Sequence, residues 1–209
     1  MVKTVIVGGG IMGMSSAYQL CQRGHEVTVI ERSTVASSAS GKAGGFLARD
    51  WGNAVTRELH EQSFKLHEQL SKEFGLKTYR KGLPTLQVNF SSKSFSDLKV
   101  NWINEEIGLT LFGNSEFAQV TPYEITTAFL KHSKVLGANL IIAAVVGVEF
   151  QNSTSFQKNL KGVYINRSLE NSTDDLELIE GDNFLFCLGP WSALLESWFP
   201  GFRIPMAGI

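Results

Sequence analysis

The sequence has no hydrophobic stretch long enough to cross a membrane, and it has only two cysteines. Its longest apolar run, Leu140–Val148, is far shorter than the ~20 residues that span a bilayer. The cysteines, Cys21 and Cys187, are far apart and form no CxxC pair, which argues against a disulfide scaffold and a zinc site. Of the four histidines, His60 and His67 share a helical face, but no acid or cysteine completes a site. We therefore expect no bound metal.

Charge of either sign is also scarce. Charged residues make up 19% of the 209 residues, and 19 basic side chains against 20 acidic ones leave a net charge of −1. Such a balance creates no field that attracts nucleic acid or an anionic membrane, so neither is an expected partner. The N-terminus also lacks a signal peptide, because its apolar residues run directly into glycines. We expect a cytoplasmic protein, and the 43% of hydrophobic residues indicates a globular one.

The first thirty residues predict a βαβ unit. Lys3–Val7 is a β-branched run without alternation, which is typical of a strand buried on both faces of a parallel sheet. A glycine-rich turn comes immediately after it, and Met12–Arg23 predicts a helix of small and apolar residues that ends at Gly24. Glu26–Ile30 predicts the second strand.

The stretch Ser33–Gly45 consists almost entirely of small residues and permits two interpretations. It is either a flexible linker or a loop whose small side chains let the backbone approach a ligand. Because it lies directly after a nucleotide-binding type of turn, the second interpretation is favoured.

The rest of the chain contains further predicted helices and strands. One amphipathic helix covers Asn53–Phe74 and a second begins at Pro122; Gly75 and Gly137 end them. The remaining segments are predicted strands or hairpins, namely Tyr79–Phe90, Leu140–Phe150, Phe156–Asp182, Asn183–Leu188 and the start of a strand in Arg203–Ile209.

Gly8, Gly10 and Gly13 fit the pattern GxGxxG between a strand and a helix. In this context the first glycine permits the tight turn, the second lets the backbone contact a pyrophosphate, and the third lets the helix pack closely. The helix amides and dipole then stabilise the phosphate charge. Glu31 ends the second strand, 23 residues after Gly8, where a carboxylate accepts hydrogen bonds from ribose hydroxyls and repels a 2′-phosphate. The pattern predicts FAD or NAD rather than NADP.

The choice between FAD and NAD depends on the segment after Glu31. An NAD-dependent dehydrogenase is expected to continue promptly with a third strand and helix, whereas here the small-residue loop and a long helix intervene. This order favours a flavin protein and leaves an NAD-dependent dehydrogenase as the alternative.

Four stretches resemble the D-amino-acid oxidase superfamily of FAD-dependent oxidoreductases, which includes glycine oxidase and sarcosine oxidase. Their order and spacing match across nearly the whole chain. The stretches are Val5–Gly13, Val29–Arg32 leading into Ala39–Ala48, Gln119–Pro122 with the later Gly137–Leu140, and Cys187–Ser192.

The resemblance implies FAD as the cofactor and divides its contacts among three groups of residues. Those that hold the pyrophosphate and the adenosine are Gly8, Gly10, Ile11, Met12, Gly13, Glu31 and Arg32. Those that line the pyrophosphate and the flavin are Ser40, Lys42, Ala43, Gly44, Gly45, Phe46 and Leu47. Those that close over the adenosine half are Cys187, Leu188, Gly189, Trp191 and Val146, the last contacting the adenine through its backbone.

Two side chains near the predicted flavin loop are open to two interpretations each. Lys42 either neutralises pyrophosphate charge or is a solvated loop lysine. Trp51 either faces the isoalloxazine ring of the flavin or packs in a core. Further along the chain, Trp102, Phe112 and Phe117 are expected to pack the core of the substrate domain.

The resemblance also implies the fold and the reaction. The fold class is α/β, with a Rossmann-like, three-layer FAD-binding domain (residues 1–78 and 120–199) and the beginning of a β-rich substrate domain (79–119 and 200–209). The implied reaction oxidises a C–N bond of a small-molecule amine or amino acid by hydride transfer to the flavin. No side chain stands out as a general acid or base, and no protein partner is indicated.

Members of the superfamily run well past 209 residues. We therefore expect a partial chain, in which catalysis by these residues alone is in question. A non-catalytic relative that keeps the nucleotide-binding fold is the second alternative.

Overall fold

The structure is a computed structural model that describes residues 1–51, 53–83, 85–89, 108–112, 116–151, 159–168 and 176–205. The chain divides into two compact units. Unit 1 comprises Met1–Ala43 and Pro122–Ile209, and unit 2 comprises Gly44–Thr121. The sequence-based domain boundary at residue 78 stays a prediction.

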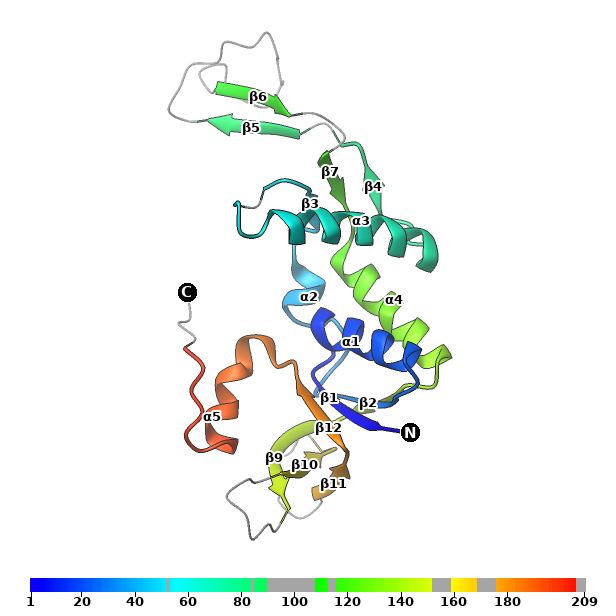
Figure 1. Ribbon diagram of the computed structural model, residues 1–209, viewed down its shortest axis with the longest axis vertical. Coiled ribbons are helices and arrows are strands. Elements are labelled where there is room, and N and C mark those ends of the chain that lie inside the picture. Colours follow the sequence, from blue (N-terminus) through cyan, green and yellow to red (C-terminus); the bar gives the residue numbers. More distant parts are fainter. Residues whose placement is uncertain are drawn as a thin grey trace. The chain divides into compact units, whose positions relative to one another are not determined.

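A parallel sheet of four strands, in the order β12–β1–β2–β8, forms the middle layer of unit 1 (Figure 1). The strands are β1 (Lys3–Val7), β2 (Glu26–Glu31), β8 (Asn139–Ile142) and β12 (Asn183–Phe186). Val5, Ile6 and Val7 of the central strand β1 are all buried. This confirms the prediction of a strand covered on both faces.

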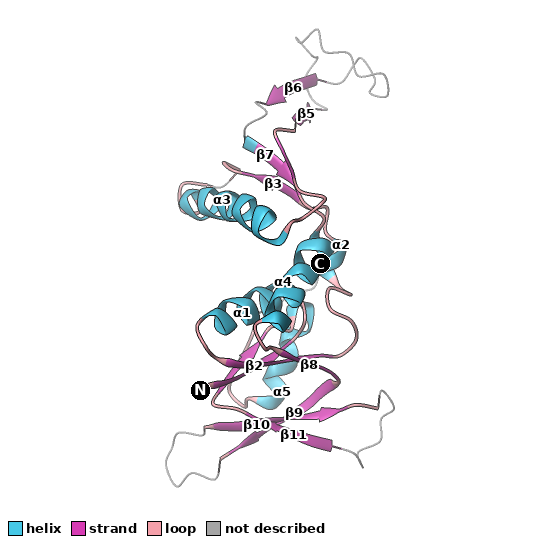
Figure 2. Ribbon diagram, turned by 90° about the vertical axis from the view of Figure 1, so that its right-hand side faces the viewer, coloured by secondary structure: helices cyan, strands magenta, loops and turns pink. Residues whose placement is uncertain are grey.

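Helices α1 and α4 cover one face of the parallel sheet, and Figure 2 shows both on the same side of β2 and β8. α1 spans Ile11–Gln22 and α4 spans Pro122–Val135. Their buried faces meet, since the ring centroids of Tyr18 on α1 and Phe129 on α4 lie 5.7 Å apart. Both predicted helices are confirmed, with ends that differ by a residue.

A second, antiparallel sheet covers the other face of the parallel sheet (Figure 2). Its order is β11–β10–β9, with β9 at Ala144–Phe150, β10 at Leu160–Asn166 and β11 at Leu176–Glu180. Val163 and Ile165 of β10 are fully buried and belong to one apolar cluster with Val5 and Val7 of β1. The three-layer α/β architecture predicted from the sequence is therefore present in unit 1.

The prediction of one strand over Leu140–Phe150 is wrong, because the segment forms two strands in different sheets. The break falls at Ala143, whose N–H donates to the carbonyl oxygen of Glu31 at 2.9 Å. No glycine or proline marks this crossing, so an apolar run alone cannot reveal it. Arg203–Pro205, expected to begin a strand, has no regular structure, and residues 206–209 lie outside the described residues.

Three short helical segments complete the described part of unit 1. They are α2 (Ala39–Lys42), η2 (Gly189–Leu194), which has 3₁₀ geometry, and α5 (Leu195–Trp198). None of the helices in the described ranges is long and apolar enough to span a membrane.

The described residues of unit 2 form a small antiparallel sheet, one long helix and a strand pair. Its elements are β3 (Phe46–Ala48), α3 (Arg57–Phe74), β4 (Arg80–Lys81), β5 (Thr85–Asn89), β6 (Gly108–Phe112) and β7 (Phe117–Gln119). The small sheet has the order β3–β7–β4, and β5 pairs with β6. The predicted helix is confirmed but begins at Arg57 instead of Asn53, and the strand interrupted near Gly82 is confirmed.

The spacing of Val55, Leu59, Leu66, Leu70 and Phe74 predicts one apolar stripe along the long helix, and this stripe is only partly buried. Leu70 is buried and Phe74 is half-buried, whereas Leu59 and Leu66 are exposed; Phe64, which lies outside the predicted stripe, is buried. Val55, which the stripe also included, precedes the helix and is exposed. The periodicity identified the helix correctly but overestimated how wide a face it buries.

Candidate functional site

The turn between β1 and α1 is held by backbone hydrogen bonds to both neighbouring strands. The Gly8 N–H donates to the Ile30 carbonyl at 2.8 Å, and the Cys187 N–H donates to the Val7 carbonyl at 2.7 Å. Gly8 has a φ of +111°, and a Cβ there would lie 2.3 Å from the Cys187 carbonyl oxygen. Only glycine fits this position, because both the backbone conformation and the available space exclude a side chain.

Gly13 lies where α1 crosses the end of β1. A Cβ at this position would lie 2.0 Å from the Gly8 carbonyl oxygen and 3.3 Å from Cγ2 of Ile6. The helix can therefore approach the strand this closely only without a side chain here. This is the close packing that the third glycine of a dinucleotide-binding turn provides.

The first turn of α1 presents backbone N–H groups that have no acceptor within the helix. The first intrahelical bond runs from the Met14 N–H to the Gly10 carbonyl at 2.9 Å, so the N–H groups of Ile11, Met12 and Gly13 point out of the helix. Ser40 Oγ accepts the Ile11 N–H at 2.9 Å. This first turn, described in full, contains no acidic residue. Its partial positive charge is thus available to an anion.

The Glu31 carboxylate, at the end of β2, is tied to the glycine turn. Oε2 accepts the Gly9 N–H at 2.7 Å, and Oε1 accepts the Ser33 N–H at 2.9 Å. Each carboxylate oxygen has further acceptor capacity, which suits the vicinal hydroxyls of a ribose. The sequence predicted Glu31 but not its partners Gly9 and Ser33, because backbone donors leave no mark in a residue pattern.

The small-residue stretch after β2 is fixed against the turn rather than free. The Ala36 N–H donates to the Gly9 carbonyl at 3.1 Å, and Ala36 is buried with a φ of +63°. Ser40 binds Ile11 as described, and Lys42 lies exposed at the end of α2. These contacts argue against the flexible-linker interpretation.

Two residues predicted to lie near the adenine end are in contact. The guanidinium carbon of Arg32 lies 5.1 Å from the centroid of the Trp191 ring. Trp191 is 42% exposed, so one side of this pair is open to a ligand.

Val146, predicted to contact the adenine through its backbone, lies at a bulge in β9. The register of β9 against β10 shifts there, since Val145 pairs with Ile165 and Gly147 pairs with Tyr164. A bulged residue is left out of the ladder, which frees its backbone groups for another partner. Val146 is also exposed.

The other residues of unit 1 that were predicted to close over the adenosine half lie in the packing and in a turn of this unit. Leu188 packs against the apolar core between the two sheets, and Gly189 has a φ of +55° at the start of η2. Cys187 is a free, half-buried thiol, and burial raises its pKa. Cys21 is also free and is buried, as expected for a small apolar residue.

In unit 2, the predicted residues lie at the beginning of the small sheet. Gly44 and Gly45 precede β3, and the Gly45 carbonyl accepts the Val120 N–H at 3.0 Å. Phe46 is exposed and Leu47 is half-buried. The geometry therefore places one large apolar side chain of this group in an accessible position.

The structure agrees with the predicted role of some aromatic residues of unit 2 and not of others. Trp51 is 61% exposed, so the core interpretation is wrong for it, whereas Phe117 is buried as expected. Trp102 lies outside the described residues, and of Phe112 only the backbone, in β6, is described.

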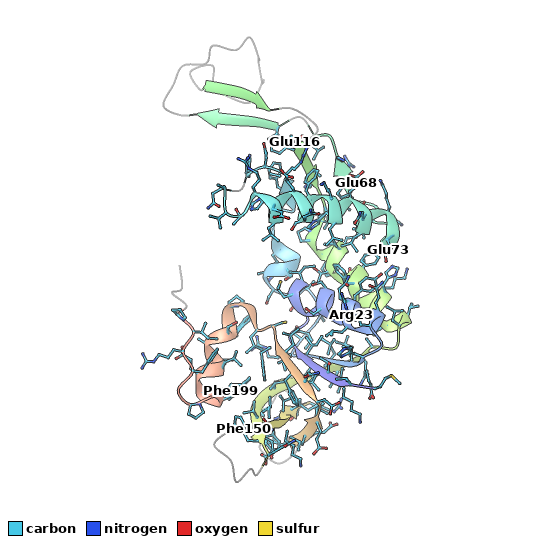
Figure 3. The ribbon with its side chains drawn as sticks, in the orientation of Figure 1. Arg23, Glu68, Glu73, Glu116, Phe150 and Phe199 are labelled. Carbon is cyan, nitrogen blue, oxygen red and sulfur yellow. The ribbon has the colours of Figure 1, made fainter. Side chains whose placement is uncertain are left out.

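A charged cluster on unit 2 was not predicted. Figure 3 labels Glu68 on α3, whose carboxylate accepts hydrogen bonds from Lys72 at 3.1 Å and Lys81 at 2.6 Å. These bonds lower the pKa of Glu68 and raise that of Lys81. The buried Tyr79 hydroxyl, which has no hydrogen-bond partner among the described residues, has a pKa raised by burial and by the Glu68 charge. Across the described ranges, no group of three or more His, Cys, Asp or Glu side chains is arranged to hold a metal.

Unit 1 also has an open cavity of about 780 Å³. Asp182 and Asn183 line it at the start of β12, whereas the glycine turn contacts the residues beyond the other end of that strand. Its apolar wall includes Phe199, whose ring faces Phe150 at 5.7 Å (Figure 3). None of the sequence-predicted site residues lines this cavity.

The strand, glycine turn, helix and terminal carboxylate form the βαβ arrangement that is typical of a dinucleotide-binding α/β fold. A family model described as FAD dependent oxidoreductase (DAO) matches residues 3–208. The chain belongs to this family.

Similar proteins include the oxidoreductase C1F5.03c of Schizosaccharomyces pombe, which is 30% identical over 226 residues; the match covers 98% of this chain and 58% of that protein. Glycine oxidase from Bacillus cereus has a similar structure, with a TM-score of 0.73, 21% identity, and coverage of 94% of this chain and 58% of the other. L-proline dehydrogenase from P. horikoshii gives a TM-score of 0.71 with 21% identity, covering 94% and 55%. The chain thus spans somewhat more than half the length of these proteins.

Proposed function

We propose that this chain binds FAD, with the pyrophosphate at the first turn of α1 and the adenosine ribose at Glu31. The observation that carries the proposal is the hydrogen bond between the Gly9 N–H and Glu31 Oε2 at 2.7 Å. It places the carboxylate beside the same turn whose amides are available to an anion. Family membership supports FAD over the NAD alternative.

The residues present fit such a cofactor. The turn has no room for side chains at Gly8 and Gly13, which keeps the backbone accessible. At the adenosine end, the Arg32–Trp191 pair offers a flat, partly exposed surface, and the bulge at Val146 offers free backbone groups. A bound flavin supplies the chemistry by accepting a hydride from the substrate.

The residues of this chain have binding and orienting roles in that scheme. The amides of α1 neutralise the pyrophosphate charge, and Glu31 excludes a 2′-phosphate by like-charge repulsion. Ser40 accepts the Ile11 N–H, so its own hydroxyl hydrogen is free to donate to a phosphate oxygen. No residue is assigned as a proton donor or acceptor.

We further propose that the substrate is a small amine or amino acid, oxidised at a C–N bond. The proposal is supported by the names of two similar structures, a glycine oxidase and an L-proline dehydrogenase. Because the chain covers 58% of the first and 55% of the second, catalysis by this chain alone is a separate question from cofactor binding.

Calorimetric titration of the purified chain with FAD, NAD and NADP tests the cofactor. We expect FAD to bind and NADP not to bind. Glu31→Gln is expected to weaken FAD binding by about tenfold to a hundredfold, since a hydrogen bond to a charged group is worth ~1.5–3 kcal/mol. Glu26→Gln, at the exposed start of the same strand, is the matched control and retains affinity. Binding of NAD but not FAD would refute the proposal.

Anaerobic mixing of the FAD-loaded chain with amines and amino acids tests the reaction. Bleaching of the flavin absorption by any of them supports C–N oxidation and eliminates the non-catalytic alternative. If FAD binds but no amine or amino acid bleaches the flavin absorption, C–N oxidation by this chain is refuted and the non-catalytic alternative is favoured.

A further inference from the structure

The open cavity of unit 1 has a size and a lining that the glycine turn does not explain. Its volume of about 780 Å³ lies within the range of ~300–1,000 Å³ that is usual for small-molecule sites. Such sites are lined mainly by apolar and aromatic side chains, with a few polar groups that orient the ligand. The apolar side chains of this lining are Leu160, Phe184, Phe186, Leu195, Phe199 and Phe202.

The aromatic walls of the cavity are fixed by contacts with the core and with one another. Phe184 and Phe186 of β12 pack against the apolar core between the two sheets. The ring of Phe199, which Figure 3 labels, lies 5.6 Å from that of Phe186 and 5.7 Å from that of Phe150. The Phe202 N–H donates to the Phe199 carbonyl at 3.0 Å. The rings are thus held in place without a ligand, which reduces the entropy lost on binding.

Asp182 is the charged residue of this lining. Its Oδ2 accepts the Lys3 backbone N–H at 2.7 Å, which orients the carboxylate but does not neutralise it. No lysine, arginine or histidine among the described residues lines the cavity. Because a carboxylate oxygen accepts more than one hydrogen bond, the negative charge of Asp182 is available to a cation in the cavity.

The neutral polar residues of the lining lie on segments that are tied to the one that carries Asp182. The Gln151 N–H donates to the Asn159 carbonyl at 2.8 Å, and the Gly181 N–H donates to the Lys161 carbonyl at 3.4 Å. Gln151 and Asn159 therefore share one hydrogen-bonded border of the cavity with Asp182. The lining combines this polar border with a wall of phenylalanine rings.

We propose that the cavity binds a cation with an aromatic body, of the class of protonated arylalkylamines. The ammonium group lies at the Asp182 carboxylate, and the aromatic ring packs against the phenylalanine rings. A carboxylate forms charge-assisted hydrogen bonds with an ammonium group, and phenylalanine rings attract both aromatic rings and cations. An anion is repelled by Asp182. The inference is independent of the proposed function, because the glycine turn contacts the residues beyond the other end of β12.

Three small probes, titrated into the full chain, test the charge and the ring separately. Naphthylethylamine carries both a ring and a positive charge at neutral pH. Naphthylacetate keeps the ring and reverses the charge, and butylamine keeps the charge but has no ring. Calorimetry is expected to show naphthylethylamine binding about tenfold or more tightly than either, as expected for a hydrogen bond between charged groups. Its binding should shift the backbone amides of Gly181, Asn183 and Phe199 in the NMR spectrum.

Asp182→Asn tests the role of the carboxylate. The variant keeps a side-chain oxygen that can accept the Lys3 N–H, so the fold is retained. It is expected to bind naphthylethylamine about tenfold more weakly. Glu26→Gln is the matched control, because Glu26 is paired with Lys3 at the same end of the sheet, is exposed and does not line the cavity. It is expected to retain the affinity.

Phe202→Ala tests the aromatic wall. Phe202 is 52% exposed, so its removal leaves the core of unit 1 intact. We expect naphthylethylamine to bind about threefold to tenfold more weakly, as for the loss of an aromatic pair, and butylamine binding to change less. Leu194→Ala removes another exposed apolar side chain, on η2 and outside the lining, and is expected to have no effect.

The inference is overturned if naphthylethylamine does not bind, if naphthylacetate binds equally well, or if Asp182→Asn binds the amine as the wild type does. Amide shifts confined to the glycine turn would also overturn it, since the amine would then bind elsewhere. Titration of the same variants with ADP reports on the glycine turn alone. Normal ADP binding would therefore leave the proposed function standing when this inference fails.

Discussion

The glycine turn of unit 1 and a group of three contacting rings in unit 2 (Phe46, Trp51 and Phe117, here called the aromatic cluster) are built in opposite ways. The turn works by leaving side chains out, so that at Gly8 and Gly13 a single methyl group would collide with backbone. The aromatic cluster instead exposes large side chains, since Phe46 and Trp51 are exposed and both contact the buried ring of Phe117. No side chain can be added at Gly8 or Gly13 without a collision with backbone, whereas an exposed side chain can be replaced by a similar one. Substitutions at the two places should therefore differ in severity.

The largest effect is expected from Gly13→Ala in the glycine turn. The new Cβ would lie 2.0 Å from the Gly8 carbonyl oxygen, which belongs to a backbone bonded into the sheet. We expect a loss of about 3 kcal/mol in unfolding free energy, the upper range for overpacking, together with loss of ADP binding. Urea denaturation and ADP titration measure the two quantities.

Gly24→Ala is the matched control for Gly13→Ala. Gly24 has a φ of +79° but no atom within 4 Å of its Cβ position, so only backbone strain of about 1 kcal/mol is expected, with ADP binding intact. Equal stability and equal ADP affinity in the two variants would show that the close packing at Gly13 does not matter.

A smaller loss of unfolding free energy is expected between the two sheets of unit 1, where side chains rather than backbone atoms are in contact. Ile165→Val removes one methylene from a fully buried position between the two sheets, which should lower unfolding free energy by about 1 kcal/mol. Ile142→Val, at a 48% exposed position on β8, should have almost no effect. If thermal unfolding of the two variants is indistinguishable, the interface between the sheets is not the core of unit 1.

The contact between Arg32 and Trp191 is weaker still. Arg32→Gln removes a cation that lies 5.1 Å from the Trp191 ring centroid, and we expect a loss of about 0.5 kcal/mol in unfolding free energy. The matched control is Arg23→Gln, because the Arg23 guanidinium donates hydrogen bonds to Gln19 of its own helix. A double-mutant cycle with Trp191→Leu isolates the pair; a coupling of zero would contradict this account.

The smallest effect is expected at the charged cluster of unit 2 and depends on pH. Hydrogen bonds from Lys81 and Lys72 lower the pKa of Glu68 below its ordinary value of 4.5. The stabilisation is therefore complete above about pH 4.5 and is lost as the pH falls through the lower folded-state value. Because the pair is on the surface, the effect should be modest and should decrease with salt.

Glu68→Gln should flatten this acid limb of the stability profile, while Glu61→Gln on the same helix serves as the comparison. Thermal unfolding measured from neutral pH to below pH 4.5 is the test. An unchanged acid limb in Glu68→Gln would show that another carboxylate is responsible.

The sequence predicts the glycine turn far better than the aromatic cluster, and the reason is the range of the contacts. Gly8, Gly13 and Glu31 lie within one βαβ unit, where local spacing encodes their geometry. The aromatic cluster joins Trp51 to Phe117, which are distant in sequence, through the pairing of β3 with β7. No local pattern contains that information.

Three further features of the structure could not be predicted from the sequence, each for its own physical reason. The crossing at Ala143 carries no turn residue, so the run from Leu140 onward looked like one strand. Ala36 has a φ of +63°, which a sequence does not reveal for a residue other than glycine. The exposure of Leu59 depends on what unit 2 places against α3, which periodicity does not contain.

The central claim is that a pyrophosphate lies at the first turn of α1. The most direct measurement is the NMR spectrum of the isotope-labelled chain during titration with ADP. The account predicts that the backbone amides of Gly10, Met12 and Gly13 shift most, because they face the phosphates. If ADP binds and these three amides do not move, or if the largest shifts fall around Phe184 and Phe199 in the cavity beside β12, the claim is contradicted.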